Sequence, residues 1–472
     1  MTTNMTRWRA VHDLFDPTEP APAHLRVDRG RYNPLAEKIT PRLGLPLPHQ
    51  KYLLAGPIGS GKSTELRAAA AGLTGHKLVI LVDLQRHFQF TVVDPNAIDR
   101  LQPAELVGLL GLAVLRAGSE VLGHSWGPRA KRLDEAIREM QPRPDPGQDA
   151  GPTLDVAKLA KGVAVFVGGA AGAVIGGPLA SALGAAGATT VAEGGLKLLE
   201  AVTDAAEWSW RLGQRGAGSP SDQDPRVRAV LSATNALLDD IRGEYQRDVV
   251  LLVDGLDRVQ DNTTFQSLFA DSSLVAELRA DLVVTLRLGL VQRHKARLHA
   301  WTPYEFTNVP VVDRADPNAA DPRGLEFFRA LTQRRMDTLA AALAPGPAFF
   351  TDAQVDALAQ RSGGRLRDFM YLVREVAVAA MLADAASATD PLIVTAIDKL
   401  RRDRESGLNA DELALLRGVL NDPQRSLPAG EVATDLLDRQ LLLPYPNEST
   451  WYLPHPILLR RLTRMAGGPA SG

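Results

Sequence analysis

Four short apolar runs along the chain have the unbroken hydrophobic character of strands that are buried on both faces of a parallel sheet. They lie at residues 52–55, 78–82, 249–253 and 282–286, and each is followed by a polar or turn segment. A further short strand is expected near residues 308–312. The pattern predicts an α/β protein built on a parallel sheet.

More than 160 residues separate the second run from the third, which is far more than a usual crossover between parallel strands. We therefore expect a helical insert at about residues 100–225. Two stretches rich in Pro, Gly and Asp, at residues 141–152 and 213–225, are typical of joints that flank part of it.

Residues 162–192 of this insert contain no charged residue, and small residues recur at every fourth position. On a helix this spacing gives a smooth face for close helix contact. Pro178 and the scarcity of basic flanking residues argue against a membrane span. We expect two tightly packed helices joined near residues 176–178, and the alternative is a segment that enters a membrane on activation.

The C-terminal third is predicted to be mostly helical. Residues 325–404 have helical spacing, with a helix start at Thr351 and a break at Gly363 and Gly364. The order from residue 409 onward is helix, helix, two-stranded hairpin, helix, which is a winged-helix pattern. The predicted domains are an N-terminal segment (1–45), a core (46–312), a helical region (325–404) and a winged helix (405–465).

Composition sets broad limits on function. A chain of 472 residues with 45% hydrophobic and 23% charged residues is expected to fold into two to four domains. Its net charge of -2 gives no overall attraction to nucleic acid or anionic lipid, and the lack of cysteine excludes thiol catalysis and Cys-ligated zinc. The start of the chain lacks a secretory signal pattern, so we expect a cytoplasmic protein, and the residue usage is typical of a high-GC bacterial gene.

The run at residues 56–64 matches a phosphate-binding loop between an apolar strand and a helix. Its glycines let backbone N–H groups turn toward a triphosphate at the positive end of the helix. Lys62 is expected to bridge the terminal phosphates and the Ser63 hydroxyl to bind Mg²⁺. The predicted ATP-binding residues here are Gly56, Gly59, Ser60, Gly61, Lys62, Ser63 and Thr64.

Two later strands are expected to end beside this loop. The run at residues 249–253 delivers Asp254, which we predict to hold Mg²⁺, and Asp257 follows where it can polarise the attacking water. The adjacent strand ends at Thr285 and Arg287, so a hydroxyl and a guanidinium are expected near the terminal phosphate.

The order of these motifs, followed by Gly363-Gly364-Arg365-Leu366-Arg367 and a winged helix, resembles the AAA+ and STAND NTPases, including relatives of the origin-recognition initiator ATPases. The resemblance implies an ASCE/AAA+-like P-loop NTPase sheet with a helical lid. It also implies that the strand ending at Arg287 lies between the loop strand and the Asp254 strand. Most AAA+ members carry Asp-Glu at the second strand, whereas Gly255 follows Asp254 here, which resembles the STAND branch and implies slow hydrolysis.

The same resemblance assigns roles outside the sheet. An arginine at the start of a lid helix would reach the phosphates, and we favour Arg367 over Arg365. A histidine of the winged helix contacts the bound diphosphate in STAND switches, and His455 lies at a similar place. Arg334 and Arg335 are weaker candidates for an arginine finger that acts on a neighbouring subunit.

The winged helix is expected to pack on the core. Its second helix carries Glu431, Asp435 and Asp438 against Arg439, which is unfavourable next to DNA phosphates. A basic cluster near the C-terminus keeps a nucleic-acid role open: Arg460, Arg461 and Arg464.

These features predict a switch that binds ATP and Mg²⁺, hydrolyses ATP slowly, and forms a homo-oligomer or joins a partner protein encoded nearby. The resemblance suggests bacterial phage defence or signalling. One alternative is a DNA-associated ATPase of the origin-recognition or transposition-regulator kind. Another is a membrane-acting effector that uses residues 162–192.

Overall fold

The computed structural model describes residues 3–73, 77–88, 95–140, 153–155, 163–167, 173–175, 209–211, 221–446 and 450–464. Two compact units divide the chain, and each has its own hydrophobic core. The sheet unit comprises Pro34–Ala55 and Glu65–Tyr304. The helical unit comprises Met1–Asn33, Gly56–Thr64 and Glu305–Gly472.

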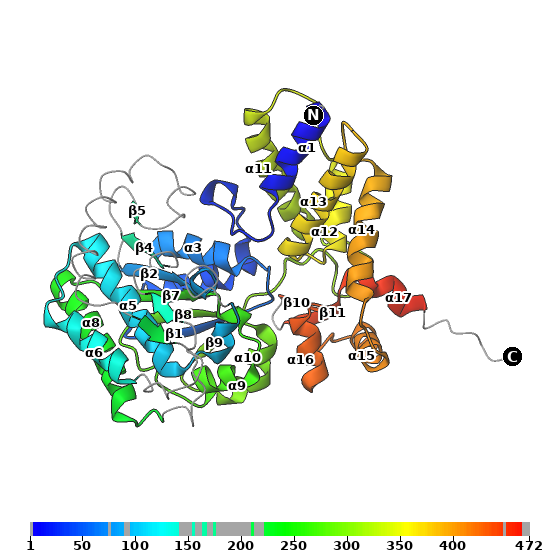
Figure 1. The fold of residues 1–472 in the computed structure, drawn as a ribbon. Helices are drawn as coiled ribbons and strands as arrows, with labels where there is room; N and C mark the ends of the chain where they lie inside the picture. Colours follow the sequence, from blue (N-terminus) through cyan, green and yellow to red (C-terminus); the bar gives the residue numbers. More distant parts are fainter. Residues whose placement is uncertain are drawn as a thin grey trace, which may run out of the picture. The chain divides into compact units, whose positions relative to one another are not determined.

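A seven-stranded sheet forms the centre of the sheet unit, in the order β5-β4-β2-β7-β8-β1-β9 (Figure 1). Strands β2, β7, β8 and β1 pair in parallel, and every residue of these four strands is buried. The predicted set of strands buried on both faces is therefore confirmed. Their bounds are β1 (Lys51–Ala55), β2 (Leu78–Asp83), β4 (Val163–Val167), β5 (Ala173–Ile175), β7 (Val249–Asp254), β8 (Asp281–Leu286) and β9 (Thr302–Glu305).

Helices flank these strands, and α5, α6 and α8 pack on one another (Figure 1). A capping box of Gln102 and Glu105 begins α5, and Pro103 is the first residue of the helix. The helices are α2 (Thr40–Leu43), α3 (Lys62–Leu73, which begins in the loop), α4 (Leu84–His87), α5 (Pro103–Leu122), α6 (Pro128–Met140), α8 (Pro225–Tyr245), α9 (Asn262–Phe265) and α10 (Leu288–His294). Shorter 3₁₀ or π turns lie at Leu35–Ile39, Pro95–Arg100, Leu256–Arg258, Gln266–Ala270 and Lys295–Arg297.

The prediction of a helical insert is wrong where the structure describes strands within it. Within residues 162–192 the structure describes β4 and β5, and both are strands. The sequence of β4, Val-Ala-Val-Phe-Val, is rich in β-branched and aromatic residues, and it pairs antiparallel with β2, whose edge it extends. A separate antiparallel pair, β3 (Thr153–Asp155) and β6 (Ser209–Arg211), also belongs to the insert. The other residues of 162–192, the predicted joint at 141–152 and most of the joint at 213–225 lie outside the described residues.

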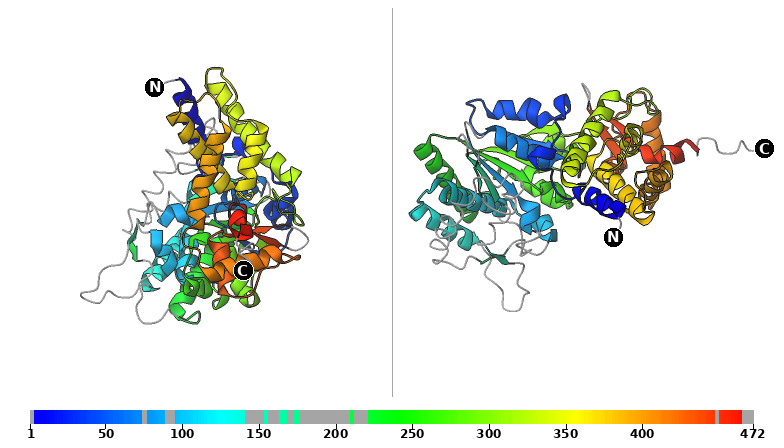
Figure 2. Two further views of the ribbon diagram at one scale, coloured as in Figure 1. Left: turned by 90° about the vertical axis from the view of Figure 1, so that its right-hand side faces the viewer. Right: turned by 90° about the horizontal axis from the view of Figure 1, so that it is seen from above.

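The helical unit contains the predicted lid and the start of the chain. Helix α1 lies alongside α13 and α11 (Figures 1 and 2). Thr351 caps α12 through a capping box with Gln354, which confirms the predicted helix start. The helices are α1 (Thr3–Leu14), α11 (Pro322–Ala342), α12 (Asp352–Arg361), α13 (Leu366–Leu382) and α14 (Asp390–Glu405), with 3₁₀ turns at Ala23–Leu25 and Gly30–Tyr32.

The predicted order helix, helix, hairpin, helix is confirmed in the C-terminal part. It consists of α15 (Ala410–Asn421), α16 (Glu431–Asp438), β10 (Leu442–Tyr445), β11 (Trp451–Pro454), a 3₁₀ turn (Pro456–Leu458) and α17 (Leu459–Arg464). The strands of the hairpin are antiparallel, and the rings of Tyr445 and Trp451 stack with centroids 4.6 Å apart. Both rings are buried, so the hairpin is part of the core of the helical unit.

The strand expected near residues 308–312 is not formed, and β9 lies earlier in the chain. The N–H of Asn308 donates to the carbonyl of Pro444 (3.0 Å), and the N–H of Val309 donates to that of Gly364 (3.3 Å). Pro310 has no N–H to donate. These residues therefore connect the winged helix to the lid instead of extending the sheet.

Among the described helices, none is both long enough and apolar enough to cross a bilayer.

We expect Gly364→Ala to destabilise the helical unit strongly. Gly364 has φ +68°, and a Cβ there would lie 1.7 Å from the carbonyl oxygen of Val309. Gly407→Ala is a matched control, because Gly407 has φ +77° but open space around it. Gly407→Ala should lower the free energy of unfolding by about 1 kcal/mol because of backbone strain. Gly364→Ala should lower it by at least about 2 kcal/mol more because of the added clash. Urea unfolding measures both, and equal midpoints would contradict the tight packing described here.

Candidate functional site

The predicted phosphate loop leaves the sheet at the end of β1. Ala55, the last residue of β1, pairs with Leu286 of β8, and α3 begins at Lys62. Gly59 and Gly61 have φ values of +82° and +101°, a region that side chains disfavour. Glycine is therefore required at both positions of the motif.

The side chain of Lys62 lies over the loop that precedes it. Its Nζ donates hydrogen bonds to the carbonyls of Gly56 (3.0 Å) and Pro57 (2.8 Å), and the residue is only 3% exposed. The hydroxyl of Ser60 also donates to the Pro57 carbonyl (2.8 Å). The Lys62 ammonium group is thus buried against the loop by hydrogen bonds to its carbonyl groups.

The first turn of α13 lies directly against this loop. Arg365 donates from Nε (3.2 Å) and Nη2 (2.9 Å) to the carbonyl of Ile58, and the N–H of Arg367 donates to the carbonyl of Gly59 (3.1 Å). A Cβ on Gly59 would lie 2.5 Å from the Cβ of Arg367. The loop glycine therefore also serves close packing of the helix that carries both predicted phosphate-sensing arginines.

The N-terminal segment and the winged helix also contact the loop. Arg29 donates to the carbonyl of Ser60 (3.0 Å), and its guanidinium lies 4.4 Å from the ring centre of Phe306. The Thr64 hydroxyl accepts from the N–H of Ala21 (3.1 Å), and Gln440 donates to the carbonyl of Ile58 (3.2 Å). Three separate parts of the sequence thus converge on one short loop.

A buried carboxylate, Asp368, joins the start of α13 to the end of α14 and to the winged helix. It accepts hydrogen bonds from Arg365, from Arg404 Nη2 (2.9 and 3.0 Å) and from His455 Nε2 (3.1 Å). His455 Nδ1 accepts from the N–H of Ile457 (3.3 Å), so the proton that the ring donates is on Nε2. The structure therefore places His455 on a carboxylate of the lid.

Burial and pairing shift the pKa values in this cluster. Burial alone would raise the pKa of the Asp368 carboxyl, but Arg365 and the hydrogen bond from His455 hold it far below its ordinary value. Burial lowers the pKa of Arg365 to about 10, so the guanidinium stays charged at neutral pH. Burial also lowers the pKa of His455, which keeps the imidazole neutral.

In the sheet unit, Asp254 and Thr285 lie side by side at the ends of β7 and β8. Val253 pairs with Val284, so the residue that follows each of them emerges at the same edge. The Thr285 hydroxyl donates to Asp254 Oδ1 (2.9 Å), and the N–H of Gly255 donates to both side chains (3.0 Å each). The Asp254 carboxylate is thus held in one orientation, as a metal ligand should be.

Asp257 and Arg287 form a second pair at this edge. Asp257 lies in the 3₁₀ turn after β7 and is 9% exposed, and its carbonyl accepts from Arg287 Nε (2.9 Å). The four residues that were predicted at these strand ends thus form two contacting pairs, Asp254 with Thr285 and Asp257 with Arg287.

Gly255 separates the two carboxylates. Its φ is +97°, and a Cβ there would lie 2.6 Å from the backbone nitrogen of Gln85. The backbone at this position thus excludes any side chain.

The structure adds residues that the sequence did not single out. Asp368 is three residues after Arg365 on one helix, a spacing at which opposite charges pair, so its role had a local signal. No local sequence signal indicated Arg29, Gln440 or Arg404, because each is distant in sequence from its partner. Asp83 ends β2 in register with Asp254, and its carboxylate lies 3.8 Å from Arg67 Nη2.

The arginine-finger candidates hold the N-terminal segment. Arg335 is 4% exposed, and its guanidinium donates to the carbonyls of Leu25 (3.4 Å) and Leu331 (3.3 Å). Arg334 donates to the carbonyl of Arg26. Burial of Arg335 removes it from any surface on which it could serve a neighbouring subunit.

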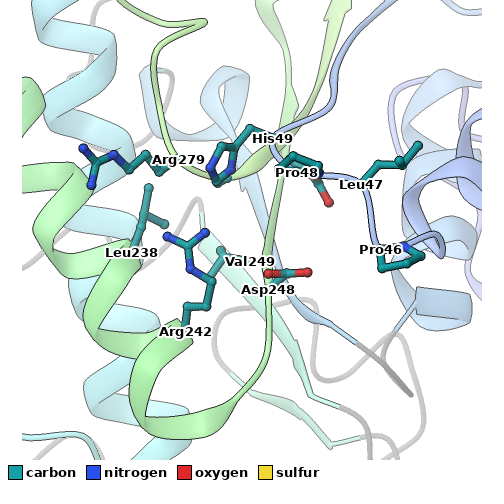
Figure 3. A pocket seen from close by; sticks show the side chains of 11 residues that line it. Pro46, Leu47, Pro48, His49, Leu238, Arg242, Asp248, Val249 and Arg279 are labelled. Atoms are coloured by element: carbon teal, nitrogen blue, oxygen red, sulfur yellow. The ribbon is translucent and has the colours of Figure 1, made fainter.

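A cavity of about 170 Å³ lies at the opposite, amino end of the strands (Figure 3). Figure 3 shows Arg242 from α8 reaching toward His49, which lies two residues before β1. Charged residues that line the cavity form ion pairs within the protein. Arg242 and Arg279 pair with Asp239, and Asp248 and Asp281 pair with Lys77.

Solved structures of similar overall length align with nearly the whole chain. The Aeropyrum pernix ORC2 protein, solved in ADPNP-ADP complexes, is 12% identical, with 96% of this chain and 98% of that chain covered and a TM-score of 0.40. The Aeropyrum pernix ORC1 protein in complex with DNA is 14% identical, with 98% of each chain covered and a TM-score of 0.37. RuvB of Thermotoga maritima is 13% identical. The alignment covers 50% of this chain and 76% of that chain, with a TM-score of 0.23. No protein-family model matches the sequence, and no curated protein matches it.

The architecture follows from the strand order and the motif positions in this structure. Strand β8 lies between β1, which precedes the loop, and β7, which ends at Asp254. The resemblance to AAA+ ATPases predicted this order, and the order is confirmed. The chain has a P-loop ATPase fold of the AAA+ type with a helical lid and a winged helix.

The free energy of unfolding is expected to fall as the pH drops below about 6.5, because the unfolded chain takes up a proton at His455 that the folded protein does not. The contribution of His455 is complete above that pH and is lost as the pH falls through the lowered pKa. His455→Gln, which keeps an N–H donor but does not titrate, should show a shallower loss between about pH 8 and pH 5. Urea unfolding at several pH values provides the measurement, and identical pH slopes for the two proteins would refute this assignment.

Proposed function

We propose that the protein binds ATP or ADP with Mg²⁺ at the phosphate loop and hydrolyses ATP slowly, as a nucleotide-controlled switch. The observation that carries this proposal is the closed loop of residues 56–64, in which Lys62 is buried over the Gly56 and Pro57 carbonyls. Two glycines with positive φ leave the loop amides able to turn toward phosphate oxygens.

The residues at the ends of β7 and β8 fit a magnesium site. Asp254, whose carboxylate Thr285 and the Gly255 amide orient, would be one ligand, and the Ser63 hydroxyl is proposed as a second from the sequence motif. When bound, Mg²⁺ would neutralise charge on the terminal phosphates. Asp257 would orient and deprotonate the attacking water, and Arg287, held at the Asp257 carbonyl, would respond to the terminal phosphate.

The lid would complete the site. Arg367 is proposed to contact the phosphates, since its backbone already bonds Gly59. In our proposal Arg365 and His455 do not contact the phosphates themselves, because both are bonded to Asp368. Oligomer formation on nucleotide binding, and a role in bacterial defence or signalling, rest on the sequence resemblance alone.

Binding and turnover should separate in two variants. Lys62→Ala should weaken binding of a fluorescent ATP analogue about tenfold or more, because a charge-assisted contact to phosphate is lost. Asp257→Ala should bind normally but lose about 100-fold or more of the phosphate-release rate, since general-base action is removed. Lys399→Ala, at an exposed ion pair of α14, is the control for both measurements. Unchanged affinity in Lys62→Ala would reject the nucleotide site, and unchanged turnover in Asp257→Ala would reject the base.

A second candidate function is DNA association through the winged helix. Arg461 donates to the carbonyl of Glu405 (3.1 Å), which places α17 beside the end of α14, and the exposed residues Arg402 and Arg460 lie on these two helices. On α16, by contrast, the exposed residues Glu431 and Asp435 would repel phosphates. A DNA contact, if made, should therefore use the α14 and α17 arginines.

If DNA binds there, the double substitution Arg402→Glu and Arg460→Glu should weaken affinity for a labelled duplex at low salt about tenfold or more. Arg361→Glu, an exposed reversal on α12, should have little effect. Anisotropy measures affinity, and phosphate release with and without duplex measures stimulation. Lack of binding by the wild type at low salt would remove this candidate.

A further inference from the structure

We propose that Asp368 is a positioning residue that couples the phosphate loop to the winged helix. Its carboxylate holds Arg365 against the loop and, at the same time, holds His455 of the winged helix and Arg404 of α14. This inference rests on the proposed nucleotide site and specifies how that site would control the rest of the helical unit.

The first connection runs from the loop to Asp368. Two nitrogens of Arg365 donate to the Ile58 carbonyl, and the third donates to Asp368. Because the guanidinium is planar and rigid, the two bonding partners cannot move independently without breaking a bond. A shift of residues 58–59 would therefore displace Arg365 and change its hydrogen bond to the Asp368 carboxylate.

The second connection runs from Asp368 to the winged helix. His455 is fully buried, and its backbone N–H donates to the carbonyl of Leu441 (2.9 Å), next to β10. Its ring is fixed at both nitrogens, by Asp368 and by the N–H of Ile457. The imidazole therefore fixes the hairpin region relative to the start of α13.

The third connection reaches the last turn of α14. Arg404 Nη2 donates to both oxygens of Asp368, and its Nη1 donates to the carbonyl of Arg439 at the end of α16 (3.1 Å). Two guanidinium groups thus share one buried carboxylate. Breaking such a cluster leaves an uncompensated buried charge, so its members should move together.

Gln440 gives the winged helix a direct contact with the loop as well. Its side chain donates to the same Ile58 carbonyl that accepts from Arg365. The Ile58 carbonyl is thus connected to the winged helix in two ways. Gln440 bonds it directly, and His455 is connected to it through Asp368 and Arg365. A nucleotide that alters the loop at Ile58 would change both contacts, and this is the route by which we expect the winged helix to respond.

The test compares amide hydrogen exchange in β10 and β11 with and without Mg²⁺ and a non-hydrolysable ATP analogue. In the wild type we expect nucleotide to change these exchange rates about tenfold, and in Asp368→Asn less than about twofold, with nucleotide affinity kept within about tenfold. Glu375→Gln is the matched control, because Glu375 and Lys399 also link α13 to α14 but at the surface. It should respond like the wild type.

A second pair of variants covers the case in which Asp368→Asn does not fold. His455→Leu removes the donor to Asp368 and should abolish the response of β10 and β11, whereas His455→Gln keeps an N–H and should retain part of it. A full response in Asp368→Asn or in His455→Leu, with nucleotide bound, would overturn the coupling and leave the nucleotide site standing. Failure of the wild type to bind nucleotide would overturn the nucleotide site itself, and the coupling with it.

Discussion

The phosphate loop is the segment on which the helical unit depends. It continues β1 covalently, yet its carbonyl groups accept hydrogen bonds from Arg29, Arg365 and Gln440, and its glycine backbone admits the first turn of α13. Since amides of such a loop face phosphate, its carbonyls are left for the protein to satisfy. The lid, the winged helix and the N-terminal segment satisfy them, so loop geometry and helical packing cannot be changed separately.

Electrostatics explains why this contact region is built from arginines and one aspartate. Burying a guanidinium costs free energy unless its N–H groups have hydrogen-bond or charged partners. Arg365 meets this requirement with a carbonyl on one side and Asp368 on the other, and Asp368 in turn is balanced by Arg404 and by a neutral histidine donor. The cluster carries two positive charges and one negative, and the remaining N–H groups of its arginines donate to the carbonyls of Ile58 and Arg439.

The parts of this molecule that sequence could predict are those with a local physical signal. Strands buried on both faces appear as continuous apolar runs, the loop requires glycines at fixed spacing, and Thr351 with Gln354 forms a capping box within one turn. Pairings over long separations leave no such signal: Arg29 with Ser60, Gly364 with Val309, and Asp368 with His455 depend on the whole fold. The strand β4 was missed because the small residues that recur across residues 162–192 favoured a helix, although β4 itself is rich in β-branched and aromatic residues and pairs with β2.

The chemistry at the end of β7 is constrained by backbone geometry more than by residue choice. Most AAA+ members, which this sequence resembles, carry a glutamate directly after the aspartate that corresponds to Asp254. At Gly255 that glutamate would need a left-handed backbone and would place its Cβ against the amide of Gln85. Changing only this residue to glutamate would therefore not create the usual catalytic pair. The chain instead turns through Leu256 and presents its second acid at Asp257, whose backbone is fixed by Arg287.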